Sequence, residues 1–60
     1  MTDKEFQKIG EKIRILLEIQ TEYEHDSAEY NAINDEIRSL VGETDGKAQQ
    51  FVDAYERVMH

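Results

Sequence analysis

Cysteine and proline are both absent from this sequence of 60 residues. Without cysteine the chain can form neither disulfide bonds nor thiolate metal sites. The sequence also holds only two histidines, too few for a histidine-based structural zinc site within one chain. A chain this short buries only about 60% of the surface that its unfolded form exposes, and small domains usually need an added source of stability. With disulfides and metals excluded, self-association is the expected source.

Long apolar runs are also missing. The longest one, Ile15-Leu16-Leu17, is far shorter than the roughly 20 residues that span a bilayer. The charged start of the chain, Thr2-Asp3-Lys4-Glu5, does not resemble a signal peptide. Together these features predict a cytoplasmic protein that does not enter the membrane.

The usual motifs of catalysis and cofactor binding are absent as well. The three glycines stand apart, so no glycine-rich phosphate-binding loop is present. Neither serine has a histidine placed to activate it in a known motif. A chain of this size also offers little room for a cleft that would desolvate a catalytic carboxylate. We therefore expect no enzymatic activity and no cofactor.

What the sequence does contain is apolar residues at helical spacing. They predict an all-α fold with one domain over residues 1–60 and helices at about 3–23, 27–41 and 47–59. The first helix begins with the capping-box spacing of Thr2 and Glu5. Its apolar seam consists of Phe6, Ile9, Ile13, Leu16, Gln20 and Tyr23. Gly10 lies inside this helix and is either a tolerated glycine or a place where another helix approaches closely.

The two later helices show one apolar face each. Asp26 is the predicted N-cap of the second helix and Gly42 its predicted C-terminal stop. The apolar face of the second helix is Tyr30, Ile33, Ile37, Leu40 and Val41, and that of the third is Ala48, Phe51, Val52, Tyr55, Val58 and Met59. Short connections favour antiparallel neighbours. We expect a small three-helix bundle, or a helical hairpin with a docked third helix, that forms a homodimer.

The first helix has more apolar surface than one seam requires. Ile15 and Ile19 lie about 140° and 100° from the centre of the seam and form a second stripe. One interpretation is that this helix is central and touches the other two on different sides. The other, which we favour, is that Ile15 and Ile19 contact a second copy of the chain. Gln20 on the seam would then set the register of that contact, as lone polar residues do in coiled coils.

Negative charge is concentrated in the middle of the chain. The formal net charge is −7, and residues 15–36 contain no lysine or arginine. Asp26 and Glu29 suit the start of a helix, whereas Glu22 and Glu24 fall in the predicted last turn of the first helix, where carboxylates are disfavoured. The acidic segment is either a solvated face or a binding surface. Its carboxylates are Glu18, Glu22, Glu24, Asp26, Glu29, Asp35 and Glu36.

A binding role for these carboxylates would suit a partner with a basic surface. If the first helix continues far enough, Glu18, Glu22, Asp26 and Glu29 form a row with about 6 Å between successive members. Such a row could occupy a basic groove, including one that normally holds a nucleic-acid backbone. The chain lacks a basic patch, so we expect no direct binding to nucleic acid. The predicted partner-binding residues are Glu18, Glu22, Glu24, Asp26 and Glu29.

Two other functions are compatible with single motifs. Glu22 and His25 have the Glu-x-x-His spacing of di-iron bundles, but such sites need two of these motifs and two further glutamates, so no metal site is predicted. An oligomer could also bind a small ligand in pockets between chains, lined by Tyr23, Tyr30, Lys12 and Arg14. The favoured prediction is an interaction protein that inhibits or modulates a larger protein, as small antagonists encoded by phages and other mobile elements do.

Overall fold

The described part of the chain is built from three helices and contains no strand. The computed structural model describes residues 2–59, and the side chain of Met59 lies outside the described part. The helices are α1 (Asp3–Gln20), α2 (Ala28–Glu43) and α3 (Gln49–Met59). Thr2 caps α1, because its hydroxyl accepts a hydrogen bond from the Glu5 N–H at 3.2 Å. The predicted all-α class is thus confirmed.

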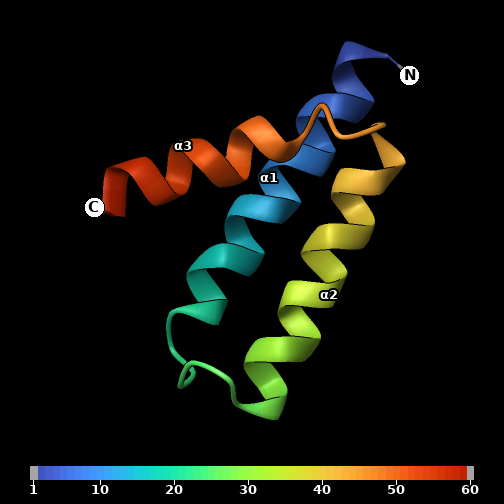
Figure 1. The fold of residues 1–60 in the computed structure, drawn as a ribbon. Helices are drawn as coiled ribbons and strands as arrows, with labels where there is room; N and C mark the ends of the chain where they lie inside the picture. The colour runs from blue at the N-terminus through green and yellow to red at the C-terminus, as the bar shows by residue number, and fades with distance from the viewer. Residues whose placement is uncertain (1, 60) are drawn as a thin grey trace.

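The arrangement is a hairpin with a third helix docked on it. Figure 1 shows α1 and α2 side by side and antiparallel, while α3 begins near the start of α1 and diverges from the hairpin toward its C-terminal end. Both α2 and α3 pack against α1, so α1 is the central helix. The core is small and consists of the buried residues Ile13, Leu17, Ile37, Leu40 and Ala48.

Helix α3 meets α1 at a glycine. A Cβ atom built on Gly10 would lie 2.6 Å from Cζ of Phe51, closer than real Cβ contacts come. The Phe51 ring therefore occupies the space that any larger residue at position 10 would fill. On its other side this ring packs against Phe6, with ring centroids 5.3 Å apart. Of the two interpretations of Gly10, close approach of another helix is the correct one.

The first helix ends earlier than its apolar seam predicts. It stops at Gln20 and not at Tyr23. The hydroxyl of Thr21 donates to the carbonyl of Glu18 at 2.6 Å, and its N–H bonds to the Leu17 carbonyl at 3.3 Å. Side-chain bonds of this kind compete with continued helical pairing. The chain then turns, and the N–H of Glu22 bonds to the Ile19 carbonyl at 3.0 Å.

The second helix differs from its prediction at both ends. Its N-cap is Ser27, whose hydroxyl accepts from the Tyr30 N–H at 3.1 Å. Asp26 was predicted to cap it but has a φ of 70°, in the left-handed region that Asp tolerates better than most residues. Gly42 lies inside α2, and the helix ends at Glu43. The predicted stop at Gly42 is wrong because Asp45 and Gly46 provide the positive φ angles that turn the chain.

Thr44 holds the turn between α2 and α3. Its side chain is buried, donates to the Val41 carbonyl at 2.8 Å and accepts from the buried N–H of Ala48 at 2.9 Å. Through this hydroxyl the end of α2 is tied to the start of α3. The sequence identified a turn here but not the role of Thr44.

Replacing Thr44 with valine is expected to lower the free energy of unfolding by about 1–3 kcal/mol, because the shape is kept while the Ala48 N–H loses its acceptor. Urea denaturation followed by circular dichroism measures this change. Thr44→Ser keeps the hydroxyl and removes one methyl group, so it is expected to cost about 0.8 kcal/mol. A serine variant less stable than the valine variant would contradict this role.

Candidate partner-binding surfaces

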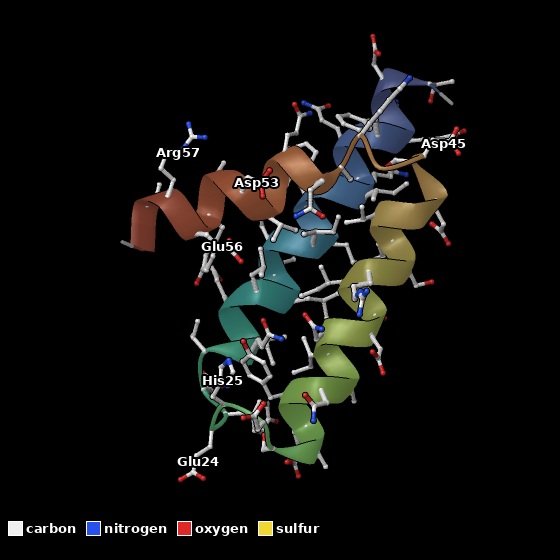
Figure 2. All side chains as sticks on the ribbon, viewed as in Figure 1. Glu24, His25, Asp45, Asp53, Glu56 and Arg57 are labelled. Carbon is white, nitrogen blue, oxygen red and sulfur yellow. The ribbon has the colours of Figure 1, made fainter. Side chains whose placement is uncertain are left out.

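The five predicted partner-binding carboxylates gather at one end of the hairpin. Glu18 is in the last turn of α1, Glu29 is in the first turn of α2, and Glu22, Glu24 and Asp26 lie in the connection between them. All five side chains are exposed. Figure 2 shows Glu24 at this end of the molecule, pointing away from both helices. We call these five residues the acidic end.

The acidic end is a cluster around a turn and not a straight row. Because α1 stops at Gln20 and the helical turns end by Tyr23, the spacing that begins at Glu18 does not continue to Asp26 and Glu29. The predicted row with about 6 Å between carboxylates is therefore wrong. Glu22 and Glu24 lie in the connection and not, as the sequence predicted, in the last turn of α1; that turn holds Glu18 instead.

Charge compensation at the acidic end is weak. No lysine or arginine occurs in residues 15–36. The one ion pair among residues 2–59 joins His25 Nδ1 to Asp26 Oδ1 at 3.4 Å, and both side chains are largely exposed. The His25 ring packs against Tyr30, with ring centroids 4.7 Å apart. The carboxylates at this end are thus largely available to cationic groups from outside the chain, although Glu18 lines one groove with Arg14.

Ile15 and Ile19 form an exposed apolar stripe on α1. Their side chains are 57% and 39% exposed. The interpretation that α1 is central and touches both other helices is correct, but these contacts leave Ile15 and Ile19 exposed. Whether a second chain covers them is not decided by a single chain, and their predicted role in self-association remains a prediction.

Gln20 does not lie on this stripe. It is only 7% exposed, and its Nε2 donates to the backbone carbonyl of Tyr30 at 3.2 Å. This bond joins α1 to the start of α2 within one chain. The amide of Gln20 is thus already used inside the fold, and its predicted role in the register of a contact between chains remains a prediction.

The end of α3 adds apolar surface that the sequence did not predict. Val58 is 84% exposed although it lies on the predicted apolar face of the third helix. It borders an open groove of about 290 Å³ between α1 and α3, lined by Arg14, Glu18, Phe51, Ala54, Tyr55 and Val58. The groove exists because α3 diverges from the hairpin (Figure 1). The only sequence signal was an apolar face that continues to the end of a helix.

The residues proposed to line a ligand pocket do not converge within one chain. Lys12 and Arg14 are two residues apart on α1, so they point in directions about 160° apart around the helix. Tyr23 is in the connection, and Tyr30 packs against His25 on α2. A pocket that used all four would have to be assembled from more than one chain.

The Glu-x-x-His spacing of Glu22 and His25 is not presented on a helix. Both residues are in the connection between α1 and α2. Within residues 2–59 no group of three or more His, Asp or Glu side chains is placed to hold a metal ion. The helical geometry that gives this motif its meaning in di-iron bundles is therefore missing here.

Comparison with known proteins identifies no relatives. No family model matches the sequence, and neither curated proteins nor solved structures give a significant match. Among the described helices, none has both the length and the apolar character needed to cross a bilayer.

Proposed function

We propose that this chain is a cytoplasmic, non-enzymatic interaction module whose acidic end binds a basic surface of a larger protein and thereby inhibits or modulates it. The observation that carries the proposal is the exposure of Glu18, Glu22, Glu24, Asp26 and Glu29 at one end of the hairpin, in a segment without lysine or arginine. Exposed charges of one sign attract a partner of opposite sign over about 10 Å at 0.1 M salt.

The shape of this end supports the proposal. A turn between two helices projects from the molecule, so its side chains can enter a concave basic surface that a flat face would not reach. Figure 2 shows Glu24 and His25 at this tip. The packed hairpin behind the tip, tied together by the bond from Gln20 Nε2 to the Tyr30 carbonyl, limits the loss of conformational entropy on binding.

Removing the charges of the acidic end tests the proposal. In the acidic-end variant, all five residues are replaced by their amides: Glu18→Gln, Glu22→Gln, Glu24→Gln, Asp26→Asn and Glu29→Gln. Immobilised wild-type protein is expected to retain a specific protein from a lysate of its source cells at 0.1 M salt and to release it at 1 M salt. The acidic-end variant should retain at most about one tenth of the partner protein that the wild type retains, because complementary charge drives association.

A control variant separates position from net charge. It carries five amide substitutions elsewhere on the exposed surface: Glu36→Gln, Glu43→Gln, Asp45→Asn, Asp53→Asn and Glu56→Gln. Both variants change the formal charge from −7 to −2. The control should retain the partner nearly as well as the wild type. Equal retention by the two variants, or retention by the wild type that salt does not weaken, would disprove a role for the acidic end.

We also propose that the chain forms a homodimer through Ile15 and Ile19. Two large aliphatic side chains adjacent on a helix surface bury apolar area when they meet a like surface. Sedimentation velocity should show a dimer for the wild type at about 0.5 mM and a monomer for Ile15→Lys with unchanged helix content. A wild type that stays monomeric at that concentration would disprove self-association and leave the acidic end as a separate question.

A further inference from the structure

The exposed face of α1 carries charges that would pair with those of the same face on a second, antiparallel chain. Lys8, Lys12, Ile15 and Ile19 lie within about 60° of one another around α1. All four side chains are exposed. The centre of this face is about 170° from Gly10, where α3 packs, so α3 does not cover it. We call it the α1 face.

Charge changes sign along the α1 face. The two lysines precede the isoleucine pair, and Glu22, Glu24 and Asp26 follow it. The hydrogen bond from the Glu22 N–H to the Ile19 carbonyl keeps the chain coiled through Glu22, which thus lies about one turn beyond the isoleucines. On the α1 face itself the order is cationic, apolar and then anionic, and Glu11 and Glu18 border this face beside Ile15.

We propose that a second copy of this chain occupies the α1 face, with the two α1 helices antiparallel about a two-fold axis between Ile15 and Ile19. This arrangement rests on the proposed self-association and specifies its geometry. Ile15 of each chain packs against Ile19 of the other, and the same register sets Lys12 of each chain opposite Glu22 of the other. Lys8 of each chain then lies toward the connection of the other chain, which carries Glu24 and Asp26.

Complementarity of charge selects the antiparallel direction. In a parallel pair each lysine would face the same lysine and each glutamate the same glutamate, which is repulsive at both ends of the face. In the antiparallel pair both ends carry opposite charges, and each favourable contact occurs twice because the interface is isologous. One helix face is smaller than the 1,200–2,000 Å² that stable interfaces bury, so a dissociation constant of about 100 µM is expected.

Disulfide trapping tests the direction and the register. The chain has no cysteine of its own, so single cysteines report single contacts. Mixing Lys12→Cys with Glu22→Cys under mild oxidation should give a covalent dimer that contains one copy of each variant. Each variant alone should give at least tenfold less dimer, as should Lys12→Cys mixed with Arg38→Cys, which places the second thiol on the exposed side of α2.

Charge reversal provides a second measurement that needs no cysteine. Lys12→Glu and Glu22→Lys should each sediment as monomers at 0.5 mM, because each variant sets two like charges opposite each other twice. Mixing the two single variants, or combining both substitutions in one chain, should restore the dimer.

Each negative result would rule out a different part of the proposed arrangement. If Lys12→Cys alone traps as well as the mixture, the helices are parallel and the proposed arrangement is wrong, although self-association stands. If the wild type dimerises but neither reversed charge affects it, the contact lies elsewhere on the chain. If the wild type is monomeric at 0.5 mM, both the arrangement and the proposed self-association are wrong. The role of the acidic end toward another protein is tested separately by comparing the acidic-end variant with Ile15→Lys, which removes the proposed dimer contact and keeps all five carboxylates. Retention of the partner by Ile15→Lys but not by the acidic-end variant assigns the binding to the acidic end.

Discussion

Replacing Ile13 with alanine is expected to lower the free energy of unfolding by about 2–5 kcal/mol, as other large-to-small changes in cores do. Ile13 is fully buried, and it packs in the core with Leu17, Ile37 and Leu40. The surrounding structure relaxes only partly around a deleted side chain, so part of the cavity remains. A domain of this size has a total stability of roughly 3–9 kcal/mol. Thermal and urea denaturation should therefore show that the variant has lost a large fraction of the total stability.

Ile15 is the matched control for this experiment. It has the same side chain, lies two residues along the same helix and is 57% exposed. At about 5 µM protein, where the chain is monomeric, Ile15→Ala should change the free energy of unfolding by less than about 1 kcal/mol. Equal losses for the two variants would mean that α1 is rotated about its axis relative to the fold described above, and the α1 face would then not exist.

The difference between Ile13 and Ile15 illustrates how much of the fold is encoded in local spacing. The apolar seam of α1 includes Ile13 and excludes Ile15, and the structure follows that division. The same reasoning located three helices and placed Ile37 and Leu40 toward the core. Such patterns work because a helix face repeats every 3.6 residues whatever the helix packs against.

The ends of the helices were less predictable, since single side chains decide them. The seam continued to Tyr23, yet the hydroxyl of Thr21 bonds back to Glu18 and the helix stops at Gln20. Asp26 and Ser27 are both good N-caps, and neighbouring candidates cannot be ranked from spacing alone. Only the backbone geometry shows that Ser27 caps α2 and that Asp26 adopts a left-handed conformation.

The sequence predicts the candidate surfaces where they depend on a single helix, but not where they depend on packing between helices. Exposure of Ile15 and Ile19 followed from their angular position on α1. The hydrogen bond of Gln20 did not, because it requires the Tyr30 carbonyl of another helix to lie 3.2 Å from its amide. The exposure of Val58 depends on the divergence of α3 from the hairpin, which no local pattern indicates.

The early end of α1 links the two proposed surfaces. A helix continued to Tyr23 would have carried Glu22 and Glu24 into its last turn, against the helix dipole. Ending at Gln20 moves these carboxylates into the connection, where they form the acidic end, and leaves Ile15 and Ile19 as the last apolar pair of the helix. Thr21 marks this end of α1, because its hydroxyl and N–H bond to carbonyls of the last turn.

Gly10→Ala is expected to lower the free energy of unfolding by about 1–3 kcal/mol, even though alanine is the better helix former by about 1 kcal/mol. The added Cβ would lie between 2.6 and 2.9 Å from three ring atoms of Phe51. The ring cannot move away freely, because it also packs against Phe6. Relief of the clash therefore requires α3 to shift on α1. Equilibrium urea denaturation followed by circular dichroism at 222 nm measures the loss.

Gly42→Ala is the control, and it is expected to change the free energy of unfolding in the opposite direction. Gly42 is also helical, but a Cβ there would meet nothing within 4 Å. Its replacement should raise the free energy of unfolding by up to about 1 kcal/mol, through helix propensity and a less flexible unfolded chain.

Combining Gly10→Ala with Phe51→Leu should cost less stability than the sum of the two single changes, because leucine leaves room for the new methyl group. If Gly10→Ala and Gly42→Ala stabilise the chain equally, α3 does not approach α1 at Gly10. The docking of the third helix would then be wrong, while the hairpin of α1 and α2, with the acidic end and the α1 face, would remain.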